Sequence, residues 1–589
     1  MSTVTHRPNN VDNGKARQSQ QQQAATATAA WLQTSKKDGS ASSVTTSTST
    51  SGSGSSLSLT YIYNRNIIIK LALLTRICIW IFAFVVTRWL SAFDSSSSLK
   101  SLSPLINTTN NMTNPSEWLT SHHSSIVDST IYRVFVKWDS FFYLRIAEYG
   151  YEYEQFHAFF PAYPLLIRWV SNALSFISLG HLHHYDALVL SAFIISNVSF
   201  VMSAVQLLKL GIVIFNGHRL AFVAAVLYCI NPANIFMSAV YTESVFNLFV
   251  FAGLYYLLGG RFYLSPSRQL GLDRMPTSRM VFSSMVGSLL FAAATFTRSN
   301  GILLSGFVIF NHMAPLFTRL FRRAFIVLNA LTQRKRSSPA LSHSTSFGNI
   351  DALAGMGVGE FILRLLLIVV QVAVVVLPYI LFQYYGYQRY CSRTLDDSKY
   401  GEWPRPWCGK PFPNIYAFVQ HHYWNQGFFN YYTVQQIPNF LLAAPMVVLS
   451  VCAVVSYVRH YARNPYDMNP AVASRIHRLK IKVGGQASPY HTPNLLPFVT
   501  YLAIITIFSV TFMHVQVITR FFTHSPLIFW FAAKPFVDID SLSSSSSQQQ
   551  HRVGTGSNRL FSSQTMITGY FMLYNILGCI LFPNFYPWT

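Results

Sequence analysis

The chain has 589 residues; 51% of them are hydrophobic, 11% are charged, and the formal net charge at pH 7 is +23. Since a soluble globular domain carries roughly 25% charged residues, this composition excludes an ordinary soluble protein. The basic residues cluster in short segments between apolar stretches, as in cytoplasmic loops of membrane proteins, and no nucleic-acid-binding motif accompanies them. We therefore expect an all-α polytopic membrane protein and exclude nucleic acid as its partner.

The N-terminal segment is rich in Ser, Thr, Gln and Ala. It contains too little apolar surface to offset the entropy of ordering, so residues 1–58 are expected to form a disordered cytosolic tail. Two similar low-complexity inserts, at 337–346 and 541–550, are expected on the cytosolic side as well. The remaining residues, 59–589, are assigned to one multispan membrane domain.

The first predicted membrane-spanning helix runs from Ile67 to about Ala92. Lys70 and Arg76 at its leading end place the N-terminus in the cytosol, because positively charged flanks stay on the cytosolic side. The loop that follows, residues 93–186, is therefore expected on the luminal side. N-glycosylation requires a luminal position, and the loop contains sequons that agree with it. These sequons begin at Asn107 and Asn111.

Further apolar stretches follow and alternate in direction across the membrane. They cover residues 188–215, 220–237, 242–258, 281–297, 302–317, 365–381, 441–458, 497–513, 523–533 and 564–580. Since a transmembrane helix needs about 20 apolar residues, the chain is expected to form about eleven spans. A second large luminal loop is predicted at 388–438. Cys391 and Cys408 share this loop, and an oxidising lumen would allow them to form a disulfide.

Two patterns look like ligand-binding motifs. One is a glycine run, Gly355, Gly357 and Gly359. No strand precedes it, so it does not indicate a dinucleotide site. The other is a cluster that would suit a metal ion, formed by His181, His183, His184 and Asp186. Histidines at the edge of a span are usually solvated, so we expect neither a cofactor nor a metal.

The unusual polar residues of the chain fall on the predicted luminal side. Asp139 lies at the start of an aromatic-rich segment, 138–149, that is typical of a short helix in the membrane interface. A carboxylate held at the membrane edge indicates function, because charge is costly in hydrocarbon. Asp139 is the candidate catalytic residue. The candidate substrate-binding residues on the same side are Trp138, Arg145, His157, Glu243, Arg298, Asn300, Trp424 and Arg520.

A carboxylate in this position could take a proton from a sugar hydroxyl, while arginine or histidine stabilises a departing phosphate. Aromatic rings suit both the faces of sugars and a polyprenyl tail. These residue types do not separate such an enzyme from an ion-coupled transporter, whose intramembrane aspartate and arginine would look alike. Transporters often contain paired repeats with broken helices, and no such symmetry is visible in this chain.

Short motifs spread over roughly residues 60–589 carry a family resemblance. They are Trp138-Asp139-Ser140, His157-Ala158-Phe159-Phe160-Pro161, Asn231-Pro232-Ala233, Tyr241-Thr242-Glu243-Ser244, Thr297-Arg298-Ser299-Asn300-Gly301, Trp424-Asn425-Gln426-Gly427-Phe428, Gln436-Ile437-Pro438-Asn439-Phe440 and Thr519-Arg520-Phe521. Any one of them is weak, but the ordered set is specific. It resembles the GPI mannosyltransferase 2 family, polyprenyl-phosphate-sugar-dependent glycosyltransferases with the GT-C fold.

The resemblance implies an enzyme of the endoplasmic reticulum membrane that uses dolichyl-phosphate mannose as its donor. It would add the second mannose, in α-1,6 linkage, to a mannosylated GPI precursor, with a small membrane accessory subunit as a further partner. By similarity the reaction inverts a β-linked donor, so one base suffices, and Asp139 is its candidate. Beyond what the resemblance implies, we infer from the residue types that His157 or Arg298 meets the donor phosphate and that Glu243 orients the acceptor hydroxyl. Another lipid-linked-sugar glycosyltransferase is the alternative.

Overall fold

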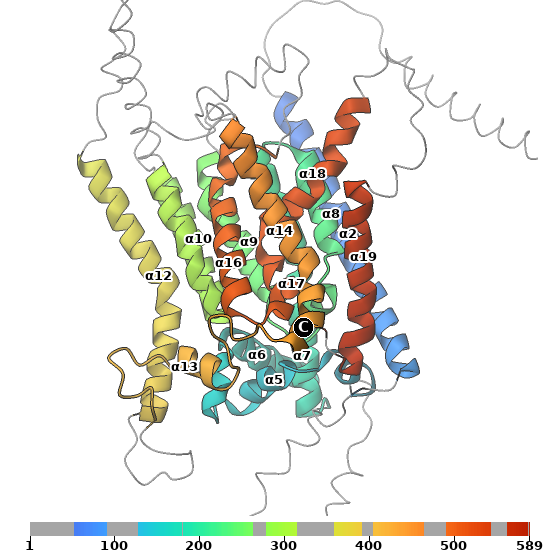
Figure 1. The fold of residues 1–589 in the computed structure, drawn as a ribbon, viewed down its shortest axis with the longest axis vertical. Helices are drawn as coiled ribbons and strands as arrows, with labels where there is room; N and C mark the ends of the chain where they lie inside the picture. Colours follow the sequence, from blue (N-terminus) through green and yellow to red (C-terminus); the bar gives the residue numbers. More distant parts are fainter. Residues whose placement is uncertain are drawn as a thin grey trace, which may run out of the picture. The chain divides into compact units, whose positions relative to one another are not determined.

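The computed structural model describes residues 52–90, 93, 128–179, 181–262, 278–314, 358–391, 405–463, 490–543, 562–586 and 588. The chain divides into two units, Met1–Leu59 and Thr60–Thr589, and the second unit contains the helices described below except the first residues of α2. The described residues form helices and no β-strand (Figure 1). Seven of these helices are long and apolar enough to cross a membrane. The all-α polytopic class is therefore confirmed.

Each apolar stretch that was predicted to span the membrane overlaps a helix. The bounds are α2 (Gly52–Trp89), α7 (His184–Phe215), α8 (His218–Cys229), α9 (Glu243–Phe262), α10 (Ser278–Thr297), a helix over 305–314, α12 (Val358–Cys391), α14 (Ile437–Arg463), α16 (Leu496–Phe512), α18 (Pro526–Ser543) and α19 (Ser563–Leu581). The predicted number of eleven spans is not confirmed. Within the described residues, α8 and the apolar part of α9 are shorter than the seven candidate spans.

Several predicted boundaries differ from the structure. Helix α8 ends at Cys229 rather than near residue 237, because Pro232 lacks the N–H that would continue a helix. Helix α12 continues to Cys391, well past residue 381. Helix α2 begins at Gly52, so the last residues of the predicted tail are helical. The rest of the tail, the insert at 337–346 and most of the insert at 541–550 lie outside the described residues, as do Asn107 and Asn111.

Arg76 does not lie at the membrane surface, as the orientation argument assumed. It is 1% exposed in the middle of α2. Its Nη1 donates to the carbonyl of Asn234 and to Oγ of Ser238, both at 3.0 Å, and its guanidinium lies 3.8 Å from the centre of the Phe200 ring. Arg76 therefore holds the short helix η4 (Asn234–Met237), and the predicted orientation rests on Lys70.

Helix α9 packs between α7 and α10 in the centre of the bundle. Two glycines allow α9 and α10 to approach closely, since a Cβ at Gly253 would lie 2.5 Å from Cε1 of Phe291 and one at Gly287 would lie 2.8 Å from the backbone nitrogen of Leu257. Small residues at helix contacts are typical of membrane proteins, in which van der Waals packing drives association. The contact holds the site-facing ends of α9 and α10 in a fixed relation.

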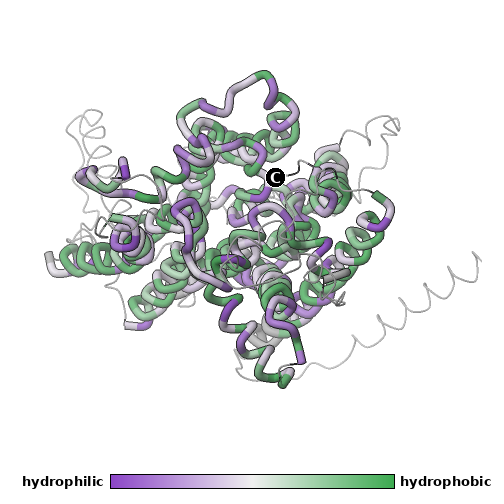
Figure 2. Tube along the Cα trace, turned by 90° about the horizontal axis from the view of Figure 1, so that it is seen from below, coloured by the Kyte–Doolittle hydropathy of each residue, from purple (hydrophilic) through white to green (hydrophobic). Residues whose placement is uncertain are grey.

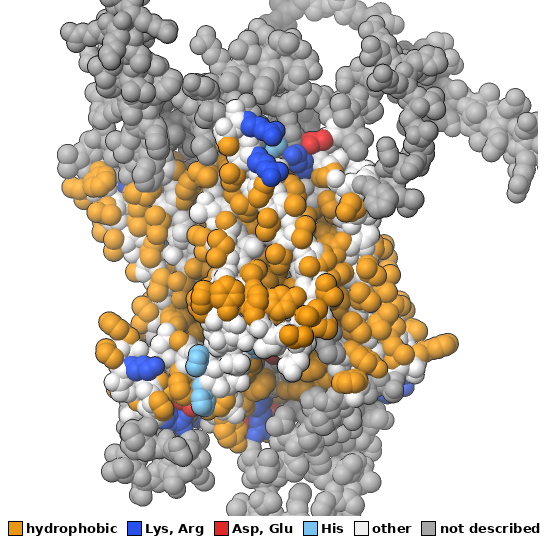
Figure 3. Space-filling view, viewed as in Figure 1, with side chains coloured by type: hydrophobic (Ala, Val, Ile, Leu, Met, Phe, Trp, Pro, Cys, Tyr) orange, Lys and Arg blue, Asp and Glu red, His pale blue; other side chains and the backbone are white. Residues whose placement is uncertain are grey.

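The surface of the bundle suits a lipid environment. In the face shown in Figure 3, hydrophobic side chains cover the middle, while Lys and Arg lie near the two ends. Large apolar residues on the outside of the bundle include Phe282, Val369 and Ile507, which are 71%, 59% and 67% exposed. Such exposure would be costly in water but is favourable against lipid tails.

Short helices gather at one end of the bundle, where they form the floor of the site. They are α5 (Ser140–Tyr149), η3 (Glu154–Ala158), α6 (Ala162–Ile177) and α13 (Ile415–His422). Figure 2 looks onto this end, where hydrophilic residues concentrate in the connecting segments. A disulfide joins Cys391, the last residue of α12, to Cys408 in the segment before α13. The sequence predicted α5 but neither α6 nor α13.

Candidate active site

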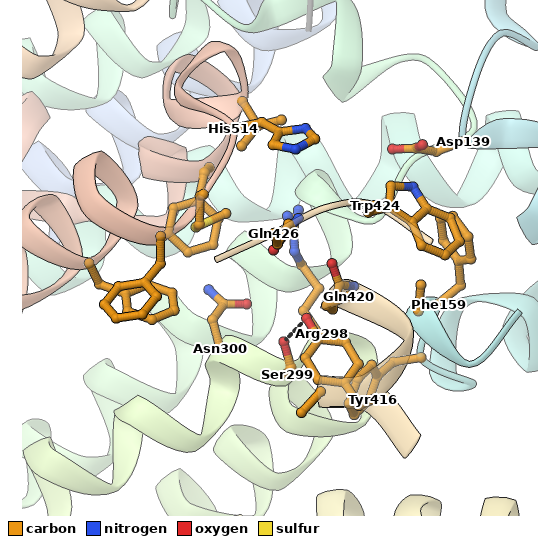
Figure 4. Close-up of a pocket in the computed structure, with 18 of the residues that line it drawn as sticks. Asp139, Phe159, Arg298, Ser299, Asn300, Tyr416, Gln420, Trp424, Gln426 and His514 are labelled. Carbon is orange, nitrogen blue, oxygen red and sulfur yellow. Dashed lines mark hydrogen bonds between the residues drawn. The ribbon is translucent and has the colours of Figure 1, made fainter. Parts of the chain in front are cut away.

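A cavity of about 730 Å³ lies among α5, α13, α16 and the turn after α10. Its lining contains the predicted residues Trp138, Asp139, Arg298, Asn300, Trp424 and Arg520. Figure 4 shows Asp139 and Trp424 on one side of the cavity, Asn300 across from them and Arg298 between. The fold therefore brings together residues from segments that are far apart in the chain.

The backbone directly before Asp139 adopts a conformation that is rare for a bulky residue. Trp138 has a φ of +52°, in the left-handed region, which costs about 1 kcal/mol for a residue with a Cβ. Strain of this kind is concentrated at functional sites. Asp139 is the N-cap residue of α5, yet its side chain makes no capping hydrogen bond. The carboxylate therefore stays directed to the cavity, and 29% of the side chain is exposed.

Tyr241 fixes the backbone of the Trp138-Asp139 turn through its hydroxyl. Its hydroxyl donates to the carbonyl of Lys137 and accepts from the backbone N–H of Asp139, both at 3.3 Å. The tyrosine is completely buried at the end of the segment that leads into α9. Sequence reasoning listed Tyr241 only as a motif residue, and the structure gives it the task of holding the Trp138-Asp139 turn in register with α9.

Two carboxylates and two arginines form a connected cluster beside the cavity. Nη2 of Arg520 lies 3.0 Å from Oδ2 of Asp139, and Nη1 of the same arginine lies 3.3 Å from Oε1 of Glu243. That oxygen also accepts from Nη1 of Arg298 at 2.7 Å. Burial alone would lower the pKa of Arg520, but the carboxylates of Asp139 and Glu243 raise it above its usual value. Arg520 is therefore held as a cation at the cavity wall.

Glu243 has a different position from the one predicted. Its side chain is 1% exposed, and the cavity lining does not include it. It lies behind Arg298 and Arg520, where its single negative charge serves both cations. A carboxylate in this place sets the position of the arginines, and it does not reach an acceptor hydroxyl in the cavity.

The turn after α10 presents Arg298 and Asn300 to the cavity. It is possible because residue 301 is glycine: a Cβ at Gly301 would lie 2.4 Å from the backbone nitrogen of Thr295. Nδ2 of Asn300 is buried without a hydrogen-bond partner, so it can donate to a ligand. Oγ of Ser299 lies 2.7 Å from the hydroxyl of Tyr416, which links this turn to α13 (Figure 4).

Two further predicted substrate-binding residues, Arg145 and His157, are also absent from the cavity lining. Arg145 pairs with Glu152 at 2.7 Å on the outer side of α5. His157 is 0% exposed and stacks on the ring of Phe382. Burial, reinforced by the charge of Arg389, lowers the pKa of His157 to about 3, so the imidazole is neutral and does not offer a cation to a phosphate.

The lowered pKa of His157 predicts a specific pH dependence of stability. Below pH 6.5 the unfolded chain binds a proton at this residue that the folded protein does not, so stability falls as the pH falls. At a pH of about 5.5 the loss is about 1 kcal/mol. Melting temperatures in detergent at pH values of about 7.5 and 5.5 should therefore drop less for His157→Gln than for wild type. An equal drop in both proteins would contradict this assignment.

The cavity has two chemically different sides that sequence reasoning did not find. One side is apolar and consists of Ile302, Leu303, Ile504, Phe508 and Phe512. The other, between α5 and α13, is aromatic and polar and includes Tyr416, Gln420 and Gln426. The apolar residues belong to uniformly apolar stretches, which do not single them out. On the polar side, Trp424 and Gln426 belong to a motif that the sequence analysis selected, but Tyr416 and Gln420 of α13 carry no such pattern.

The site combines a carboxylate that can accept a proton, two guanidinium groups that can bind an anion, and an apolar surface that can hold a lipid. Among the described residues, no group of three His, Cys, Asp or Glu side chains is placed to hold a metal ion. This arrangement suits transfer of a group from a lipid-linked phosphate to a hydroxyl, with proton transfer to Asp139.

Comparisons with known proteins agree with this chemistry. The GPI alpha-1,6-mannosyltransferase 2 of Cricetulus griseus is 30% identical over 489 residues, which cover 77% of this chain and 87% of that protein. The Homo sapiens protein of the same name is 30% identical over 488 residues, with the same coverage. The GPI mannosyltransferase 2 of Drosophila melanogaster is 28% identical over 470 residues, covering 77% of this chain and 86% of that protein.

No solved structure matches the chain. The family model described as Mannosyltransferase (PIG-V) matches residues 65–334 and 358–589, and these ranges contain every charged residue of the cluster. The chain therefore belongs to the PIG-V family of mannosyltransferases.

Proposed function

We propose that the protein transfers the second mannose, in α-1,6 linkage, from dolichyl-phosphate mannose to a mannosylated GPI precursor. The observation that carries the proposal is that Asp139, Arg298 and Arg520 line one cavity, where a proton acceptor lies beside two cations that can bind a phosphate. The names of the relatives, GPI alpha-1,6-mannosyltransferase 2, support the linkage and the acceptor.

The apolar side of the cavity suits the polyprenyl chain of the donor. Leu303, Phe508 and Phe512 line the cavity and are 39%, 46% and 40% exposed. In a bilayer these residues would face lipid tails, so an isoprenoid chain could pass from the membrane into the cavity without crossing water. Its phosphate would then lie near Arg298 and Arg520, because charge-assisted hydrogen bonds to guanidinium groups are strong.

In the proposed reaction the 6-hydroxyl oxygen of the acceptor mannose attacks C1 of the donor mannose. Asp139 accepts the hydroxyl proton, and the bond between C1 and the phosphate oxygen breaks. Its electron pair leaves with dolichyl phosphate, whose added negative charge Arg298 and Arg520 stabilise. Attack opposite the leaving phosphate inverts C1 and requires no covalent enzyme intermediate.

The ion pair between Asp139 and Arg520 has a role in the order of substrate binding. The two side chains lie 3.0 Å apart, and a donor phosphate would compete with Asp139 for the same guanidinium. Once the phosphate binds Arg520, an oxygen of Asp139 becomes available to the acceptor hydroxyl. Binding of the donor would thus make Asp139 available as a base before the acceptor hydroxyl reacts.

We further propose that the cavity faces the lumen of the endoplasmic reticulum and that the N-terminus is cytosolic. The disulfide between Cys391 and Cys408 supports this side, because disulfides persist in oxidising compartments and this one lies next to the cavity wall. The sequons at Asn107 and Asn111 belong to the same predicted loop as Asp139 and support it independently.

The experiment that tests the function is complementation of a cell line that lacks its second GPI mannosyltransferase. The full chain should restore GPI-anchored proteins at the cell surface and clear the accumulated one-mannose precursor, which radiolabelled lipid extracts would show. Persistence of that precursor, in cells that produce the protein in the endoplasmic reticulum, would overturn the proposal.

A further inference from the structure

A segment of the second large loop forms the aromatic and polar wall of the cavity. We call residues 405–427 the strap. It includes α13 and contributes Tyr416, Ala417, Gln420, Trp424, Gln426 and Gly427 to the cavity lining. On its opposite side, Ile415 and Val419 are completely buried. The strap is therefore a packed layer between the cavity and the surrounding chain.

One carboxylate holds the strap at both of its ends. Oε2 of Glu154 pairs with Nη1 of Arg405 at 2.7 Å, and the indole N–H of Trp407 donates to Oε1. At the far end of the strap, the hydroxyl of Tyr423 donates to Oε2 at 3.1 Å. Glu154 itself is buried on η3, and its side chain is 9% exposed. Sequence reasoning did not select Glu154, because an isolated glutamate in a loop carries no pattern.

The hydrogen bond between Glu154 and Tyr423 affects the cavity wall through the neighbouring residue, Trp424. Tyr423 directly precedes Trp424, whose ring meets Phe142 and Phe159 edge-on at 6.2 and 6.0 Å. Phe142 lies in the first turn of α5, which begins right after Asp139. In Figure 4, Trp424 lies beside Asp139 and Phe159, with Gln420 and Gln426 facing the same space. The position of Trp424 relative to Asp139 therefore depends on the contacts of Glu154.

We infer that the strap is the binding wall for the acceptor glycan and that Glu154 is the residue that positions it. The inference rests on the proposed function and assigns its two substrates to different sides of the cavity. An indole, a phenol and two carboxamides are the groups that recognise sugars, because rings pack on the apolar faces of sugars while amides exchange hydrogen bonds with hydroxyls. The apolar side, formed by Ile302, Leu303, Ile504, Phe508 and Phe512, presents only hydrocarbon side chains and fits the donor lipid.

The charge and one of the two carboxylate oxygens of Glu154 can be removed with almost no change in size. In Glu154→Gln, Arg405 loses its carboxylate partner. Trp407 and Tyr423 donate to different oxygens of Glu154, so one of these donors would face the amide NH2 group, which does not accept. The strap then loses a charge-assisted contact, so the KM for the acceptor should rise about tenfold. The kcat and the KM for dolichyl-phosphate mannose should stay near the wild-type values, since Asp139, Arg298 and Arg520 keep their contacts.

Kinetics of the purified full chain would test this, with dolichyl-phosphate mannose and a synthetic mannosyl-glucosaminyl-phosphatidylinositol acceptor. Glu154→Asp keeps the charge and should recover part of the acceptor affinity. Tyr423→Phe removes a single hydrogen bond at a half-exposed position and should raise the acceptor KM about threefold. This variant carries the test if Glu154→Gln does not fold. The matched control is Glu152→Gln, two positions away, whose salt-bridge partner is Arg145 of α5.

The outcomes separate this inference from the proposed function. If wild type transfers no mannose to the acceptor, the function itself is wrong. If wild type is active and Glu154→Gln and Tyr423→Phe match it in acceptor KM, the inference is overturned. It is also overturned if both variants change only kcat or the donor KM, because the strap would then serve the donor or the reaction and not the acceptor.

Discussion

Replacement of Asp139 by asparagine should lower the rate of mannosyl transfer at least about 100-fold, because a positioned general base contributes a factor of this size or more. Asparagine has the same shape and can still accept a hydrogen bond from Arg520, but it cannot take up the proton of the acceptor hydroxyl. The protein should fold normally, since Asp139 makes no capping hydrogen bond to α5. Initial rates with saturating donor and acceptor would measure the effect.

The control for this variant is Asp186→Asn. Asp186 lies in the first turn of α7, on the same predicted side of the membrane but outside the cavity lining. It should transfer mannose at the wild-type rate. Full activity of Asp139→Asn would remove Asp139 from the mechanism, and equal losses in both variants would indicate a general effect of charge on this side of the protein.

Replacement of Glu243 by glutamine should cost about 3 kcal/mol of folding stability, because breaking a buried ion pair leaves charge without compensation. Here one carboxylate serves both Arg298 and Arg520, at 2.7 and 3.3 Å, and it is 1% exposed. The two guanidinium groups would then repel each other at the cavity wall. The melting temperature of the variant in detergent should fall by several degrees, and transfer should be lost with it.

Glu152→Gln provides the comparison for Glu243→Gln. The pair of Glu152 with Arg145 has the same length, 2.7 Å, but its side chains are 23% and 16% exposed. Exposed pairs contribute about 0–1 kcal/mol, so this variant should melt close to wild type. If Glu243→Gln has the same melting temperature as Glu152→Gln, then Arg298 and Arg520 do not depend on the shared carboxylate, and Glu243 does not hold them in place.

The helices of this protein were predictable because each apolar stretch carries its own signal. The residues at which the helices end were less predictable. Pro232 stops α8 before the apolar stretch ends, whereas α12 continues through Pro378 to Cys391, past the predicted end at residue 381. Helix α13 escaped prediction altogether, since it is short and lies in a loop that looks merely polar.

For the site residues, the useful signal was the rarity of charged side chains next to apolar stretches. Asp139, Arg298 and Arg520 were selected because charged residues are unusual beside apolar stretches, and the structure brings these three together. The same rule failed for His157, since a sequence does not reveal that an imidazole is buried and neutral. The rule also failed for Arg76. The sequence analysis interpreted this residue as a charge at the membrane surface, whereas it is buried and donates to the carbonyl of Asn234.

The long separation between Asp139 and Arg520, 381 residues, has a consequence for the synthesis of the protein. A ribosome that has delivered everything up to α16 into the bilayer has made Asp139, Glu243 and Arg298, but the cation that joins both acids is still missing. Since chains enter the membrane from the N-terminus, the enzyme becomes competent only after Arg520 has been made. Truncated products therefore cannot consume the sugar donor.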